Sequence, residues 1–371
     1  MKHLQPLDAV LALYSHEHHQ SSEAIVASLS KVIFSEKDKR AAGRLRRTFA
    51  RAFYQILQWT TTSEEDDAET GSRGTVFNNK ILDRCKHGFA ASLMGSSKQE
   101  NAAFMEGDPM NGHYMMIAPE LRLNGGLWDR VFFDSVQGKD LQLRLAWETR
   151  ATYEAAKSSL EKGEPVRLKA VAAGTGLSMI LTYDRLIREG FNPELITALI
   201  TDREEANIEK ATRLLDKLST TKGNKFTREN GYGISAATED IFAEHGADGP
   251  AQYDVVTAMG ILEYFRGSSY HTTEERLNLP PPVESETAHD LAMRLSNMTA
   301  NRAKLIINTY KNEASTRILE LFGRRFSYRS RENLRSLLAS ANFRPSRLMG
   351  SGNIYDVEVY EKENIPVGAM P

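Results

Sequence analysis

Two glycines separated by one residue lie in the segment whose residue types best suit ligand binding. This segment, Ala172–Ser178, reads AAGTGLS; it follows the apolar run VRLKAV and precedes a helical pattern. Gly174 and Gly176 lack side chains where the backbone turns sharply, so a ligand can approach the main chain. The N–H groups of the following helix would then face that ligand. Many tight turns also need glycine, so the motif alone leaves a purely structural role open.

Acidic residues end the next two expected strands. Asp202 ends the run LITALITD, and a carboxylate at this place can accept both hydroxyls of an adenosine ribose. Its alternative role is to cap the helix that follows, because Asp is a favoured N-cap residue. Glu239 and Asp240 end the third strand, where either carboxylate could face an adenine amino group.

These residues need a sheet that brings strand ends together. Strand patterns cover residues 166–174, 195–202, 234–240, 253–260 and 303–310, with helical patterns between most of them, and RLMGS with YDVEVYEK closes the chain as a pair. Such alternation predicts a parallel sheet covered by helices on both faces, and the closing pair suggests one antiparallel edge strand. Residues 1–160 show mainly helical patterns, including a long helix over 141–160. We therefore expect an N-terminal helical cap (1–160) and a sheet domain (161–371).

The succession AVAAGTG, ALITD, AATEDIF and YDVVTAMGILEYF resembles the motifs of class I S-adenosylmethionine (SAM)-dependent methyltransferases. The resemblance covers about residues 166–362. It implies an α/β fold with a Rossmann-like, seven-stranded, doubly wound sheet whose last strand is antiparallel, and it implies SAM as cosubstrate or substrate. The residues that it places around SAM are Ala172, Gly174 and Gly176 at the methionine part, Asp202 at the ribose, Glu239, Asp240 and Ile241 at the adenine, and Met259 and Gly260 beside the sulfonium.

The first strand departs from this family pattern at one position. Family members usually carry an acidic residue two positions before the glycine cluster, where this chain has Ala170. That carboxylate normally helps to hold the methionine ammonium of SAM, so its loss should lower the pKa of the amine. The sequence thus leaves three functions open: methyl transfer to a small molecule, attack of the amine of SAM on its own γ-carbon (or the related aminocarboxypropyl transfer), and SAM binding without catalysis. The second reaction would form azetidine-2-carboxylate and release methylthioadenosine.

Three polar residues are candidates to hold the reacting group: Asn111, Tyr153 and Ser178. Neutral hydrogen-bond partners favour a neutral amine, and the helical cap gives the chain a looser resemblance to azetidine-2-carboxylate-forming SAM cyclases. The structural alternatives are a turn residue for Asn111, a buried helix aromatic for Tyr153 and a helix N-cap for Ser178. Arg144 and Arg150, near one face of the long helix, could pair with a carboxylate of SAM or of a substrate.

Composition argues against several kinds of partner. The chain carries 47 Lys+Arg against 49 Asp+Glu, a net charge of -2, whereas proteins that bind nucleic acid usually have a basic excess. No apolar run approaches the length of a membrane span, and the N-terminus lacks a secretory signal pattern. The single cysteine, Cys85, builds neither an internal disulfide nor a thiolate metal site. We therefore expect a cytoplasmic enzyme for a small molecule, with no metal, nucleic-acid or membrane partner.

Overall fold

The computed structural model describes residues 136–222, 233–243, 253–267, 271–272, 287–312 and 326–363. These ranges contain every strand expected from the sequence. The candidate residue Asn111, and the expected cap apart from its last helix, lie outside the described residues.

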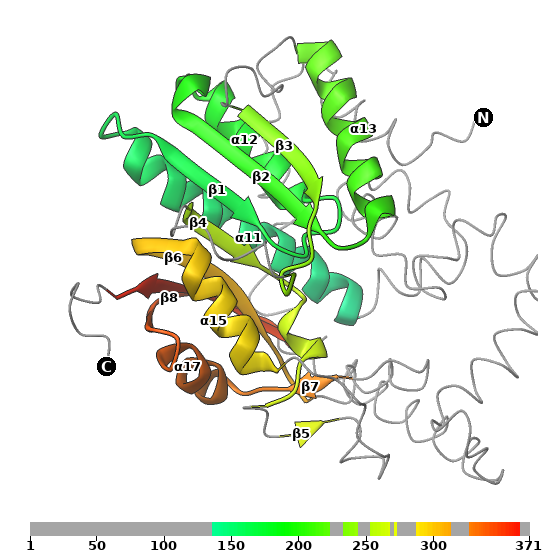
Figure 1. Cartoon of the computed structure of the whole chain (residues 1–371), viewed down its shortest axis with the longest axis vertical. Helices are drawn as coiled ribbons and strands as arrows, with labels where there is room; N and C mark the ends of the chain where they lie inside the picture. The colour runs from blue at the N-terminus through cyan, green and yellow to red at the C-terminus, as the bar shows by residue number, and fades with distance from the viewer. Residues whose placement is uncertain are drawn as a thin grey trace, which may run out of the picture.

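Seven strands form one sheet in the order β3-β2-β1-β4-β6-β9-β8 (Figure 1). The strands are β1 (Val166–Ala170), β2 (Ile196–Asp202), β3 (Gly233–Thr238), β4 (Tyr253–Ala258), β6 (Thr299–Tyr310), β8 (Phe343–Ser351) and β9 (Tyr355–Lys362). Neighbours among the first five strands of this order pair in parallel, whereas β9 pairs antiparallel with both β6 and β8. The expected seven-stranded Rossmann-like sheet is confirmed. The expectation of an antiparallel edge strand is wrong, because the antiparallel strand β9 is internal and the edge strand β8 runs in the direction of β6.

Helices cover both faces of the sheet. Figure 1 shows α11 (Val136–Leu160) and α12 (Leu177–Arg188) on one face and α15 (Ala288–Met298) and α17 (Arg331–Ala339) on the other. α13 (Glu205–Lys222) joins the first group through its buried Leu215. Alternate strand positions enter the two cores: Ile306 of β6 packs with α11 and α12, whereas Leu305 and Ile307 pack with α15 and α17. Burial on both faces explains why these strands are almost wholly apolar.

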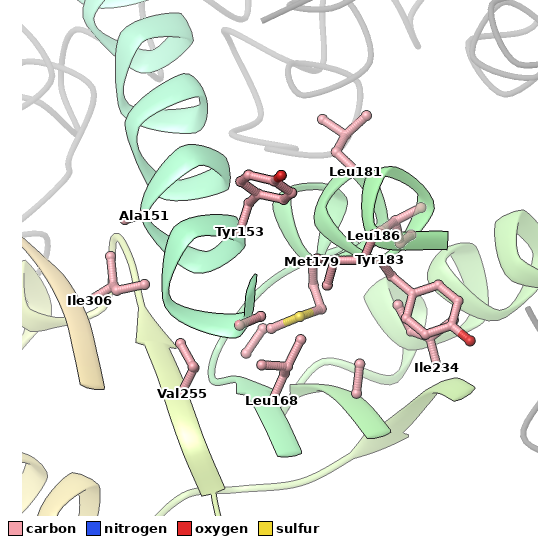
Figure 2. Packing of buried hydrophobic residues seen from close by; sticks show 14 of the residues in the cluster. Ala151, Tyr153, Leu168, Met179, Leu181, Tyr183, Leu186, Ile234, Val255 and Ile306 are labelled. Atoms are coloured by element: carbon pink, nitrogen blue, oxygen red, sulfur yellow. The ribbon is translucent and has the colours of Figure 1, made fainter. Parts of the chain in front are cut away.

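The helix α11 is a layer of the sheet unit. Its Ala151 and Ala156 are buried in the core that also contains Leu168 of β1 and Met179 of α12, and Figure 2 shows part of this packing. The backbone carbonyl of Thr149 accepts a hydrogen bond from the Thr182 hydroxyl of α12 at 3.3 Å. The expected division of the chain after residue 160 placed this helix in the cap, whereas in the structure it packs on the sheet.

The start of α11 is fastened to the turn between β8 and β9. The Asp140 carboxylate accepts hydrogen bonds from the backbone N–H of Ile354 and from the side-chain amide of Asn353. Two glycines let α11 pack closely here. A Cβ added at Gly352 would lie 2.5 Å from the Asp140 carboxylate, and a Cβ added at Gly350 would overlap the Trp147 ring. The turn therefore fixes where the first half of α11 crosses the sheet.

The helix α15 was not expected from the sequence pattern. It begins with a capping box: the Thr287 hydroxyl accepts a hydrogen bond from the Asp290 N–H at 3.2 Å, and the Asp290 carboxylate accepts one from the Thr287 N–H at 2.8 Å. Two short strands, β5 (His271–Thr272) and β7 (Ser327–Tyr328), form a separate antiparallel pair.

Candidate active site

The strand order reverses beside β1, which has β2 on one side and β4 on the other. In open α/β sheets of this kind, ligands bind outside the carboxyl ends of the strands at such a reversal. The glycine turn after β1 and the segments after β2, β3, β4 and β6 all begin at this edge. Most residues that the sequence assigned to SAM binding follow these strands, so the fold brings them to one end of the sheet.

The turn between β1 and α12 has a backbone that few residues other than glycine adopt. Gly174 and Gly176 have φ values of 57° and 61°, and Ala172 has a φ of 49° although it carries a side chain. Gly176 is the N-cap residue of α12 and supplies no side-chain cap. A Cβ at Gly176 would lie 2.6 Å from two side-chain carbons of Ile200. Glycine is therefore required here, and the start of α12 stays open to a ligand.

Asp202 joins the end of β2 to the glycine turn. Its Oδ2 atom accepts a hydrogen bond from the Gly174 N–H at 2.8 Å, and its Oδ1 atom accepts bonds from the Glu204 N–H at 2.9 Å and the Asn207 side-chain amide at 3.2 Å. The carboxylate thus holds the segment before α13, but Asp202 is not the N-cap residue, because α13 begins at Glu205 and the Ile208 N–H bonds to the Glu204 carbonyl. A carboxylate has about four lone-pair positions. Three are occupied here, which leaves capacity on Oδ2 for one ribose hydroxyl.

The expected adenine-binding residues have different environments. Both carboxylate oxygens of Glu239 accept hydrogen bonds from Lys169 Nζ, at 2.6 and 2.8 Å, and Lys169 is buried within β1. The carboxylate of Asp240 is exposed and accepts only the Phe242 N–H at 2.9 Å among its described hydrogen bonds, and Ile241 is buried. Lys169 thus neutralises Glu239, whereas Asp240 has no charged partner among its described hydrogen bonds.

The segment after β4 is held by a neighbouring strand and by α11. The Gly260 N–H donates a hydrogen bond to Asn308 Oδ1 of β6 at 2.7 Å, and Gly260 has a φ of 75°. A Cβ at Gly260 would lie 2.8 Å from Nη1 of Arg144. Met259 is buried immediately before it. Gly260, which the resemblance places beside the sulfonium, therefore lies close to a cationic side chain from α11.

A buried carboxylate follows in the short helix η4 (Leu262–Tyr264). Glu263 is 5% exposed, and its Oε2 atom has no hydrogen-bond partner among the residues that the structure describes. Burial raises the pKa of Glu263, although Arg144, Arg329 and the hydrogen bond with Asn308 act against the rise. Arg329 holds this segment in place, because its guanidinium donates hydrogen bonds to the carbonyls of Leu262 and Gly267, each at 2.7 Å.

Arg144 and Glu148 lie one helical turn apart on α11. The Arg144 guanidinium lies 4.8 Å from the ring centroid of Tyr355. The Glu148 carboxylate is 8% exposed and accepts hydrogen bonds from the hydroxyls of Ser178 and Thr257. Burial raises the pKa of Glu148, and these hydroxyls and Arg144 offset only part of that rise. Ser178 is therefore a partner of Glu148 at the start of α12 and is not the N-cap residue.

The structure does not bring Tyr153 to this edge of the sheet. Its hydroxyl donates to the Glu189 carboxylate beyond the last turn of α12, whereas the glycine turn precedes the first turn. The Arg185 guanidinium lies 3.4 Å from the Tyr153 ring centroid, and Figure 2 shows Tyr153 projecting from α11 toward α12. Arg150 forms a surface ion pair with Glu154 at 2.8 Å. Neither Tyr153 nor Arg150 is part of the candidate site.

Glu148, Lys169 and Glu263 were not among the residues expected to form the site. The sequence could have indicated Lys169, because a lysine inside an apolar strand is almost never buried without an acidic partner. Glu148 had no local signal, because its position depends on how α11 crosses β4. Within the ranges that the structure describes, no group of three His, Cys, Asp or Glu residues could hold a metal ion. None of the helices in these ranges has the length and hydropathy needed to cross a bilayer.

Comparison with solved structures returns methyltransferases at low sequence identity. The CurJ carbon methyltransferase is 12% identical, with 97% of this chain and 100% of that chain covered and a TM-score of 0.49. The magnesium protoporphyrin IX methyltransferase ChlM of Synechocystis PCC 6803, solved with bound SAH, is 15% identical over 69% of this chain and 99% of that chain, with a TM-score of 0.38. The O-methyltransferase family 2 protein of Planctomyces limnophilus DSM 3776, in complex with apigenin, is 14% identical over 63% of this chain and 68% of that chain, with a TM-score of 0.36. No protein-family model matches the sequence, and no curated protein matches it.

Proposed function

We propose that the protein is an enzyme that transfers the methyl group of SAM to a small molecule. The observation that carries this proposal is the hydrogen bond between Asp202 Oδ2 and the Gly174 N–H at the strand reversal. It joins the glycine turn, which admits a ligand to the main chain, to the carboxylate that suits a ribose. The nucleoside part of SAM would lie across this junction, with its adenine toward Asp240.

The groups beside the glycine turn suit SAM better than a dinucleotide. Two buried carboxylates, Glu148 and Glu263, lie near the segments after β1 and β4. The Glu148 carboxylate would attract the ammonium of SAM and oppose the anionic pyrophosphate of a dinucleotide, while Arg144 and Arg329 offset part of the buried negative charge. The turn also lacks the third glycine of the dinucleotide motif GxGxxG, because Met179 stands at that position.

Glu263 suits the role of general base for the acceptor. An acceptor that bears a proton must lose it during methyl transfer, and a carboxylate whose pKa is raised is a better base near neutral pH. The lone pair of the acceptor attacks the methyl carbon, the carbon–sulfur bond electrons pass to sulfur, and the proton passes to Glu263 Oε2. S-adenosylhomocysteine is the second product. Alignment of acceptor and methyl group supplies up to about 7–11 kcal/mol of the barrier lowering.

Cyclisation of SAM is the second candidate, and it was favoured by the absence of an acidic residue at Ala170. Its chemistry needs a neutral amine, which neutral hydrogen-bond partners such as Ser178 would favour. The position of Glu148 beside Ser178 supports methyl transfer instead, since a carboxylate favours the charged ammonium. SAM binding without catalysis is the third candidate.

Product analysis separates these three functions. The protein is incubated with SAM alone and then with SAM and a panel of small hydroxyl, amine and carbon acceptors. Formation of S-adenosylhomocysteine that depends on an acceptor supports the proposal. Methylthioadenosine with a cyclic amino acid, formed without any acceptor, would replace methyl transfer by cyclisation. Binding of SAM with no turnover under any condition would favour a non-catalytic protein.

A further inference from the structure

Ala170 stands on β1 where the resemblance expects a carboxylate, and the neighbouring strand β4 contacts a carboxylate from α11. Ala170 is the last residue of β1, and its register partner on β4 is Thr257. Ala170 is fully buried in the core formed with α11 and α12. The Thr257 hydroxyl, one strand away at the same register, donates a hydrogen bond to Glu148 of α11. A carboxylate is therefore present at the end of the first strand although the strand does not provide it.

The second partner of Glu148 places this carboxylate beside the glycine turn. Ser178 lies two residues after Gly176, in the first turn of α12. Glu148 thus accepts hydrogen bonds from both sides of the strand reversal. One donor is Thr257 near the end of β4, and the other is Ser178 in the helix that follows β1. The amino-acid end of SAM would lie between these two segments if its ribose met Asp202.

We propose that Glu148 of α11 binds the α-ammonium of SAM and so replaces the carboxylate that β1 lacks at Ala170. This inference rests on the proposed function, because it concerns the same SAM site. Glu148 is a positioning residue that holds the amino-acid end of SAM while the reaction takes place at the methyl group. Its carboxylate keeps the amine protonated, and a protonated amine has no lone pair with which to attack the γ-carbon.

The neighbouring charges leave Glu148 available for a cation. Arg144 interacts electrostatically with both Glu148 and Glu263, and Arg329 also interacts with Glu263. The pKa of Glu148 stays raised in the presence of Arg144 and both hydroxyl donors. An ammonium bound at Glu148 would add a positive charge beside the carboxylate and offset the cost of its burial.

The test compares ligands with and without the amino-acid end. The variant Glu148→Gln keeps the shape of the side chain and removes its charge. Calorimetry should show the affinity for SAM and for S-adenosylhomocysteine falling about 10- to 100-fold. The affinity for methylthioadenosine, which has no ammonium, should stay unchanged. Equal losses for all three ligands, or unchanged SAM affinity, would overturn the assignment of Glu148.

Two further variants separate positioning from folding. Glu154→Gln removes a carboxylate of the same helix that pairs with Arg150 and Arg347 at the surface, and it should leave SAM affinity unchanged. Glu148→Ala combined with Ala170→Asp moves the carboxylate from α11 to β1, and it should restore much of the SAM affinity that Glu148→Ala alone loses. If the double variant unfolds cooperatively at the same denaturant concentration as wild type but does not regain SAM affinity, the proposed role of Glu148 in place of a β1 carboxylate is contradicted.

The failure of this inference can be told apart from failure of the proposed function. If the wild-type protein binds neither SAM nor methylthioadenosine, the SAM site itself is refuted, and the role of Glu148 falls with it. If both ligands bind to the wild-type protein and Glu148→Gln does not distinguish them, the inference alone is refuted.

Discussion

Replacement of Gly176 by alanine tests the turn on which the candidate site depends. The residue has a φ of 61°, and an added Cβ would lie 2.6–2.7 Å from three side-chain carbons of Ile200. The left-handed backbone costs an alanine about 1–2 kcal/mol, and overpacking a buried site costs about 1–3 kcal/mol more. Gly176→Ala should therefore lower the free energy of unfolding by about 2–5 kcal/mol.

Gly190, just beyond the other end of α12, provides a matched control. It has a φ of 90°, and a Cβ there would meet nothing within 4 Å. Gly190→Ala should lose only the backbone contribution, about 1–2 kcal/mol. Urea unfolding of both variants measures the difference, and calorimetry with SAM should show weakened binding for Gly176→Ala alone. Equal losses of stability, with SAM binding unchanged in both, would refute the steric explanation of the turn.

Three further variants test other contacts. Asp202→Asn puts an amide where the Gly174 N–H and a ribose hydroxyl need an acceptor. Calorimetry should therefore show the free energy of SAM binding weakened by about 1–3 kcal/mol, and wild-type affinity would refute the ribose contact. Burial raises the pKa of Asp140 from 3.8 to about 6, so its protonated form stabilises the fold below about pH 4 and this stabilisation is lost as pH rises through 6. Wild type should thus lose about 2 kcal/mol relative to Asp140→Asn between pH 4 and 7 in urea unfolding, and parallel stability curves would contradict this. Gly350→Ala would force a methyl group into the Trp147 ring and should lower the unfolding free energy by about 1–3 kcal/mol; wild-type stability would show that α11 can shift.

The sheet could be predicted from the sequence because its strands are buried on both faces. Residues 195–202 and 253–260 stood out as apolar runs between turn residues, and the structure has strands at 196–202 and 253–258. Strand β6 begins at Thr299, four residues before the expected start. The prediction missed these residues because the polar segment TANR does not resemble a buried strand. The antiparallel strand could not be placed between β6 and β8 from sequence, since local patterns do not specify strand order.

The positions of residues next to strand ends could be predicted from local sequence, whereas contacts that depend on helix packing could not. Gly174, Gly176 and Asp202 lie next to strand ends, so their convergence follows from a parallel sheet. The structural alternative for Tyr153, a buried aromatic residue of a helix, is what the structure has. The apolar spacing of α11 does not indicate which end of the sheet Tyr153 lies at. Glu148 contacts Ser178 and Thr257 only because α11 crosses the sheet at one particular height.

Calorimetric titration of the wild-type protein with SAM, S-adenosylhomocysteine and NAD tests the central claim most directly. The account predicts one site per chain for SAM and for S-adenosylhomocysteine, no binding of NAD, and weaker SAM binding in Gly176→Ala. Absence of heat with both sulfur nucleosides, together with saturable NAD binding that Gly176→Ala abolishes, would contradict it.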